Sequence, residues 1–231
     1  GLNDFGQSTV PAGLANVVAV AAGGLWTAVR KQDGTVVAWG YNGQGQTTVP
    51  SGLSGVVAID AGHAHILALK QDGTVIAWGW NDYGQTNIPA GLSNIVAVSA
   101  GSDHSVVLKQ DGTVVAWGSN AFGQTTVPQS LTGIVAISAG NAHTVALKQD
   151  GTVVAWGRND FGQTTVPAGL GGVVAIAAGT HHTVAIKQDG TAVAWGDNRN
   201  GQTVVPTGLT DVRMAAAFGF HTLLVRSAAG S

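Results

Sequence analysis

The stretch "KQDGTVVAWG" occupies residues 31–40, and close copies of it begin at residues 70, 109, 148 and 187. Each copy therefore begins 39 residues after the one before it. A fixed period of this size is typical of repeat architectures, in which every repeat is one supersecondary unit that packs against its neighbours. The fold of one unit therefore predicts the fold of the whole chain.

The composition favours strands and turns over helices. The 12 acidic residues are all Asp, which favours turns, and the helix-favouring Glu is absent. A formal net charge of −2 indicates neither nucleic acid nor an anionic membrane as a partner. Cys is absent as well, which excludes disulfides and thiol chemistry and leaves the cellular compartment open.

Residues 157–195 serve as the type repeat. Its apolar runs at 173–177, 183–186 and 191–195 are rich in Val, Ile, Thr and Trp, as strands are, and a shorter extended piece at 164–166 ends at Pro167. Asp189 and Gly190 are expected to supply the positive φ angles of a tight hairpin turn. About four short strands in a unit of this length predict a propeller blade.

The Gly of each "WG" gives the number of blades. It stands at 40, 79, 118, 157 and 196, and Gly1 has the same phase, so the predicted repeats are 1–39, 40–78, 79–117, 118–156, 157–195 and 196–231. The last repeat ends in "HTLLVRSAAGS" and has no "DGTVVAW" strand. We predict an all-β fold, a single domain (1–231) that forms a six-bladed β-propeller with about four antiparallel strands per blade and an incomplete last blade. The unpaired strand edge predicts self-association through that blade.

The whole repeat resembles a known family. The stretch "VVAIAAG…HHTVAIKQDGTAVAWGDNRNGQT" is similar to the repeats of the regulator of chromosome condensation family in its short bacterial form. The "GQTTVP" and "VVAWG" elements also resemble propeller-type β-lactamase inhibitors. This resemblance implies the propeller fold strongly and the function weakly. In those inhibitors aromatic residues dominate the column before the repeated His, where this chain has rings only at His181 and Phe220.

One column of the repeats consists of histidines. Its members are His65, His104, His143, His182 and His221, with Trp26 in the sixth place. Metal ligands must converge within about 2 Å of one ion, whereas a ring of blades spaces its members apart. We therefore expect a structural role, in which each His begins a second strand and hydrogen-bonds the backbone of a neighbouring blade. No metal and no cofactor is expected.

Two loops vary between repeats, just before the His and just after "WG". If each blade is a simple meander, both loops open on one face, and variation confined to one face of a copied scaffold is typical of a recognition surface. Aromatic and Arg side chains are the usual anchors of protein interfaces. The predicted partner-binding residues are Tyr41, Trp80, Tyr83, Phe122, Arg158, Phe161, His181 and Phe220.

The sequence favours a non-enzymatic scaffold that binds another protein through this face. Catalysis finds little support, because the chain has no Glu, no Cys, no "GxSxG" motif and no phosphate-binding loop, and the repeated Asp residues belong to turns. Two alternatives stay open. One is a carbohydrate-binding propeller in which Trp80, Tyr41 or Tyr83 stacks on a pyranose. The other is a recently amplified or engineered repeat protein with no evolved ligand.

Overall fold

A computed structural model describes residues 2–226. Within this range the chain forms five three-stranded sheets and one two-stranded sheet, all of antiparallel neighbours. The strands gather into two compact units. The first contains the residues up to Gln110 together with Val115–Ser119, and the second contains Asp111–Val114 and the residues from Asn120 on. No helix of the described residues is long and apolar enough to cross a membrane.

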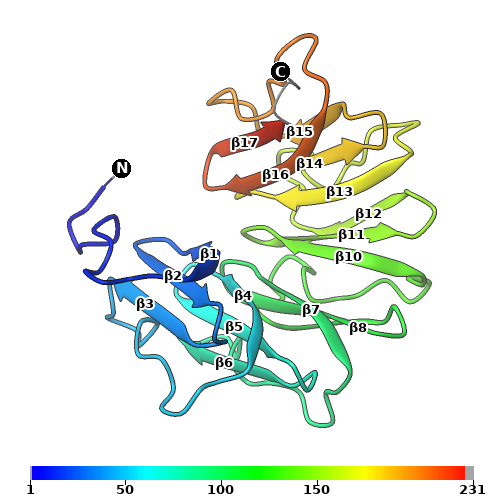
Figure 1. Cartoon of the computed structure of the whole chain (residues 1–231). Coiled ribbons are helices and arrows are strands. Elements are labelled where there is room, and N and C mark those ends of the chain that lie inside the picture. The colour runs from blue at the N-terminus through cyan, green and yellow to red at the C-terminus, as the bar shows by residue number, and fades with distance from the viewer. Residues whose placement is uncertain (1, 227–231) are drawn as a thin grey trace. The chain divides into compact units, whose positions relative to one another are not determined.

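The first unit contains three sheets (Figure 1). Their strands are β1 (Val17–Ala22), β2 (Trp26–Lys31), β3 (Val36–Gly40), β4 (Val56–Ala61), β5 (His65–Lys70), β6 (Val75–Gly79), β7 (Ile95–Ala100), β8 (His104–Lys109) and β9 (Val114–Gly118). The first residue of β9 belongs to the second unit. The first strands of neighbouring sheets, β1 with β4 and β4 with β7, pack beside each other.

The second unit repeats the pattern and ends differently (Figure 1). Its strands are β10 (Ile134–Ala139), β11 (His143–Lys148), β12 (Val153–Gly157), β13 (Val173–Ala178), β14 (His182–Lys187), β15 (Ala192–Gly196), β16 (Val212–Phe218) and β17 (His221–Arg226). Within residues 2–226, β17 pairs with β16 alone, so the last blade is incomplete as the sequence predicts. The "SAAGS" end of the tail lies outside the described residues.

The hairpin turn differs from the predicted one in its backbone angles. Gly190 has a φ of 78°, but Asp189 is not among the non-glycine residues with positive φ. Asp189 acts through its side chain instead, because its Oδ1 accepts the backbone N–H of Thr191 at 2.9 Å. The turn is therefore a three-residue loop that closes on a left-handed glycine, as in hairpins with a G1 bulge.

Each complete sheet has three strands where the sequence predicts about four. The missing member is the "QTTVP" segment, which within residues 2–226 forms no strand ladder. Side-chain bonds hold it instead: the Asn42 Oδ1 accepts the Thr47 N–H at 2.9 Å, and Trp78 Nε1 donates to the Gln46 carbonyl at 3.1 Å. The segment still lies against the outer strand, as a fourth strand would, but its Gln46 carbonyl accepts an indole N–H rather than a backbone N–H of that strand.

The tryptophan of every "WG" makes this bond with the glutamine that stands 32 residues earlier. The pairs are Trp39 with Gln7, Trp78 with Gln46, Trp117 with Gln85, Trp156 with Gln124 and Trp195 with Gln163, at 2.9–3.1 Å. Four of these indoles, from Trp78 on, are 8% exposed and belong to the core. A buried N–H needs a partner, so the recurring Gln near the start of each repeat and the Trp at its end must occur together.

Candidate functional site

The two variable loops lie side by side, as the sequence predicts. The first residue after each "WG" donates its backbone N–H to the carbonyl of the residue just before the His or Trp that begins the preceding strand. This bond measures 2.9 Å from Tyr41 to Leu25 and from Trp80 to Ala64, and 2.8 Å from Arg158 to Ala142. The sheet ladder thus continues past the strand ends, and both loops open at the same end of each sheet.

Below these loops, the repeated histidines form hydrogen bonds to the next repeat. His65 Nε2 lies 3.0 Å from Ser105 Oγ, and His143 Nε2 lies 3.2 Å from Thr183 Oγ1. The hydroxyl then donates to a backbone carbonyl, as Thr183 does to Gln163 at 2.9 Å. The sequence predicts a backbone partner for each His; the structure places a hydroxyl between the ring and that carbonyl.

Burial keeps His65 and His143 neutral. Both His65 and His143 are 0% exposed. Burial lowers the pKa of His65 to about 4 and that of His143 to about 3, with smaller contributions from neighbouring histidines. The glycine of each "AG" provides room for the ring, because a side chain at Gly140 would overlap the His143 imidazole. Among residues 2–226, no three His, Cys, Asp or Glu side chains form a group that could hold a metal ion.

The first two repeats replace this polar bond with an apolar pair. Trp26 takes the place of the His, and Ile66 takes the place of its hydroxyl partner. Both are in one core cluster, at 1% and 0% exposure. The Trp26 indole donates instead to the carbonyl of His63 at 3.0 Å. This hydrogen bond holds the variable loop that contains His63.

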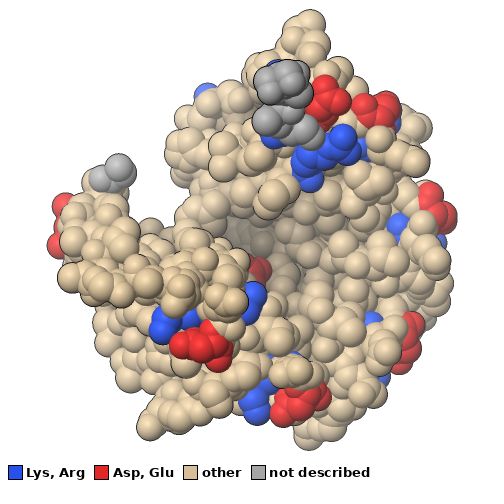
Figure 2. Space-filling view, viewed as in Figure 1, with Lys and Arg blue, Asp and Glu red and all other residues tan. Residues whose placement is uncertain are grey.

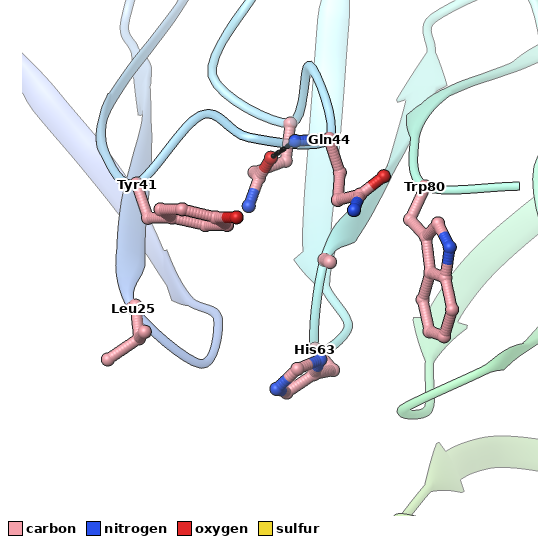
Figure 3. A pocket seen from close by; sticks show the side chains of 7 residues that line it. Leu25, Tyr41, Gln44, His63 and Trp80 are labelled. Atoms are coloured by element: carbon pink, nitrogen blue, oxygen red, sulfur yellow. Dashed lines mark hydrogen bonds between the residues drawn. The ribbon is translucent and has the colours of Figure 1, made fainter.

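Above Trp26 the first unit has a pocket of about 220 Å³. It is lined by Leu25, Tyr41, Gln44, Gln46, His63, Ala64 and Trp80. Figure 3 shows Tyr41 and Trp80 on opposite sides, with Gln44 and His63 between them. Gln46 is 0% exposed, and its Oε1 accepts the Gln44 N–H at 2.9 Å. Its Nε2 is buried without a protein partner.

The two aromatic walls are each supported by a second ring. Phe5 meets Tyr41 edge-on at a centroid distance of 4.9 Å, and Tyr83 meets Trp80 in the same way at 5.4 Å. Such edge-to-face pairs are favourable beyond the area that they bury. The walls are therefore held in place before any ligand arrives.

In the second unit the equivalent loops carry an alternation of rings and cations. The Arg158 guanidinium lies 4.8 Å from the centre of the Phe122 ring, and that of Arg199 lies 4.5 Å from Phe161. His181 continues the series, with ring centroids 5.0 Å from Phe161 and 6.5 Å from Phe220. We call Phe122, Arg158, Phe161, His181, Arg199 and Phe220 the aromatic–arginine surface.

The charges of this surface are balanced. Arg158 pairs with Asp160 at 2.6 Å, and Arg199 forms two bonds to the Asp197 carboxylate, at 2.8 and 2.9 Å. The Arg199 hydrogen bonds hold the pKa of Asp197 down to about 2. Burial, and then Arg158, lower the pKa of His181. Figure 2 likewise shows basic and acidic side chains in small adjacent groups.

The predicted site residues thus fall into two places. Tyr41 and Trp80 line the pocket, and Tyr83 supports it from outside with 54% of its surface exposed. The other five, from Phe122 on, lie on the aromatic–arginine surface. The sequence reasoning missed Gln46 and Arg199. A Gln stands at the position of Gln46 in every repeat, and this recurrence could have marked it as a candidate. The contact of Arg199 with Phe161 depends on loop geometry and has no such signal.

Comparison with known proteins gives the family. The model of the regulator of chromosome condensation (RCC1) repeat matches residues 17–46, 56–85, 95–124, 134–163 and 173–202. The chain belongs to the RCC1 repeat family. Each matched stretch runs from the first strand of a sheet to the glutamine that accepts the next indole. The finer resemblance, to short bacterial repeats and to propeller-type inhibitors, stays a prediction. A search of curated protein sequences gave no match.

Several solved structures share the fold. Yeast RCC1 (Prp20), solved bound to Kap60, is 23% identical over 94% of this chain and 69% of its own, with a TM-score of 0.78. Human WBSCR16 is 19% identical over 91% of this chain and 72% of its own, with a TM-score of 0.75. The CRINKLY WD40 ectodomain of the Arabidopsis thaliana receptor kinase ACR4 is 23% identical over 92% and 76%, with a TM-score of 0.73. The β-propeller fold is thereby confirmed.

Proposed function

We propose that this RCC1-type propeller is a non-enzymatic scaffold that binds another protein through its variable loops. The observation that carries the proposal is the aromatic–arginine surface, in which rings and guanidinium groups are stacked and remain accessible. Phe122 and Phe220 are 49% and 46% exposed. Aromatic and Arg side chains dominate the binding energy of protein interfaces, especially where they are already held in position.

The scaffold beneath the loops supports this proposal. Hydrogen bonds between repeats hold the strand ends that carry the loops, so the loop sequences can vary without loss of the fold. One solved relative binds proteins: yeast RCC1 (Prp20) was solved bound to Kap60, and a second structure of it was studied together with its binding properties to Gsp1p and histones. We extend to this chain only the general function of protein binding, through residues of its own.

The experiment compares a triple variant with a double control variant by affinity capture from a lysate of the source cells. In the first, Phe122, Phe161 and Phe220 are replaced by Ala. In the matched control, Gln149→Ala and Gln188→Ala change exposed hairpin turns at the other end of the sheets. We expect the first to lose captured partners at least about tenfold, and the control to retain them.

The control should unfold within about 0.5 kcal/mol of the parent chain, because exposed side chains contribute little to stability. The aromatic variant should lose more, since Phe161 is partly buried, and melting curves report whether it remains folded. Capture that survives the aromatic substitutions, or that the control abolishes equally, contradicts the proposal. If a partner is captured by the wild type but not by the aromatic variant, its Kd can then be measured by titration with purified protein.

A further inference from the structure

The pocket of the first unit lies where the repeat pattern is broken. Its loop reads "GYNGQGQ", whereas the fifth repeat reads "GRNDFGQ" at the same place. The aromatic side chain has moved from the fourth residue after "WG" to the first, as Tyr41. Gln44 stands where most repeats have a ring. The residues equivalent to Gln44 are Phe5, Tyr83, Phe122, Phe161 and Asn200.

Two glycines make room for the side chains that line this pocket. A side chain at Gly43 would overlap the Tyr41 ring and hydroxyl, and one at Gly24 would come within 2.9 Å of the His63 imidazole. Three of the five positions equivalent to Gly43 have Asp, namely Asp4, Asp82 and Asp160. In a chain of near-identical repeats, several departures that open one cavity indicate a site rather than drift of separate loops.

The chemistry of the lining selects the class of ligand. No Asp, Glu, Lys or Arg is among the lining residues, which favours an uncharged ligand. The amides of Gln44 and Gln46, the imidazole of His63 and the hydroxyl of Tyr41 together both donate and accept hydrogen bonds, as sugar hydroxyls do. The aromatic walls suit the apolar C–H face of a ring.

The size of the pocket and one unpaired hydrogen-bond donor narrow the class of possible ligands further. A volume of 220 Å³ equals the space of roughly seven liquid waters, which is enough for one ring and its substituents. The buried Gln46 Nε2 requires an acceptor, and a ligand oxygen at that point would supply it. The same amide is also unpaired at Gln85, Gln163 and Gln202, but of these four only Gln46 lines this pocket.

We propose that this pocket binds a single neutral pyranose, stacked on Trp80 or Tyr41 and hydrogen-bonded by Gln44, Gln46 and His63. The proposal goes beyond the protein-binding function, because it rests on first-unit residues that are separate from the aromatic–arginine surface. A partner's aromatic side chain is the competing occupant, and it is distinguished by experiment.

The test titrates the protein with four probes by calorimetry and by tryptophan fluorescence: the methyl glycosides of α-D-mannose, β-D-glucose and β-D-galactose, and p-cresol as a side-chain analogue. We expect at least one glycoside to bind with a Kd in the low-millimolar range, as befits a ligand of about a dozen heavy atoms. Binding of p-cresol alone, or of no glycoside, overturns the proposal.

Variants place the binding in the pocket. Gly43→Asp restores a residue that other repeats have, so the loop should fold normally while Tyr41 is displaced. It is expected to raise the Kd at least about tenfold. Ala121→Asp makes the same change in an equivalent loop of the second unit and should leave the Kd unchanged. Equal Kd values for both variants mean that the sugar binds elsewhere, and the proposal fails.

A second pair isolates the amide donor. Gln46→Glu keeps an oxygen that accepts the Gln44 N–H but removes the buried Nε2 donor of this pocket-lining residue. Gln163→Glu makes the same change where the side chain bonds Phe161 N at 3.0 Å. We expect the Kd to rise about tenfold in the first variant alone. Melting curves of both variants report folding, and a Kd unaffected by Gln46→Glu rules out the amide as a ligand contact.

Discussion

Two junctions between repeats, first to second and fourth to fifth, use the same repeat positions but fill them with different side chains. At the former, Trp26 and Ile66 share an apolar core; at the latter, His143 reaches the Thr183 hydroxyl at 3.2 Å. All four residues are at most 1% exposed. The two positions have changed together, which shows that the fold requires a matched pair rather than a particular residue.

The difference extends to the loops above. The Trp26 indole has no hydroxyl partner and donates instead to the His63 carbonyl. His63 lines the pocket, so this hydrogen bond connects the apolar junction to a pocket loop. The His143 junction lies beneath Ala142, which is buried at 6% exposure.

The largest loss of stability is expected when the apolar pair is broken. Trp26→His leaves a cavity and an imidazole that faces Ile66, and we expect it to lower the free energy of unfolding by about 3–5 kcal/mol. Adding Ile66→Thr restores the pair found elsewhere and should recover about 1 kcal/mol. Urea denaturation measures both. If the double variant is no more stable than Trp26→His, the two positions are not coupled in the way proposed here.

A change of pH separates the two kinds of junction without substitution. The folded chain keeps His65 and His143 neutral, with pKa values of about 4 and about 3, whereas unfolded His titrates near 6.5. The unfolded state therefore binds more protons below pH 6.5, and stability falls as the pH falls. At pH 5 each of these histidines should cost roughly 2 kcal/mol relative to neutral pH. The Trp26 junction has no such dependence.

The Asp60 carboxyl titrates in the opposite sense. Burial raises its pKa despite bonds from Ser99 and Ala100, so acidification relieves a penalty there. The comparison of wild type with His143→Ala cancels this contribution. The loss of stability between pH 7 and pH 5 should be smaller in the variant by roughly 2 kcal/mol. An identical loss in both proteins would mean that His143 does not stay neutral in the folded chain.

A further test is the cost of His143→Ala at neutral pH. It leaves the Thr183 hydroxyl without its imidazole partner, and we expect a loss of about 1–3 kcal/mol in urea denaturation. Treatment of the wild type with a chelator should leave its melting temperature unchanged, and metal analysis should find no stoichiometric zinc. A chelator-sensitive melting temperature would show that the histidines serve as ligands.

Much of the fold can be read from the repeat itself. The Asp-Gly turns, the strand-length apolar runs and the 39-residue period predict the hairpins and their order, because backbone propensity and side-chain alternation act locally. The incomplete last blade also follows from the absence of one motif. Of the candidate site, the sequence identifies the variable columns, and hence Tyr41, Trp80 and the rings of the second unit.

What the tertiary structure decides are contacts between residues that lie far apart along the chain. No local pattern shows that Trp78 bonds the Gln46 carbonyl, and this bond is why the "QTTVP" segment acts as a tether rather than as a fourth strand. That Trp26 and Ile66 together replace a His and its hydroxyl partner cannot be predicted from the sequence either, since the two residues are 40 positions apart. The sequence by itself determines the strands and the loop residues that vary. Packing between repeats determines which of those residues meet, because the pocket is lined by residues from separate loops that only the folded sheets bring together.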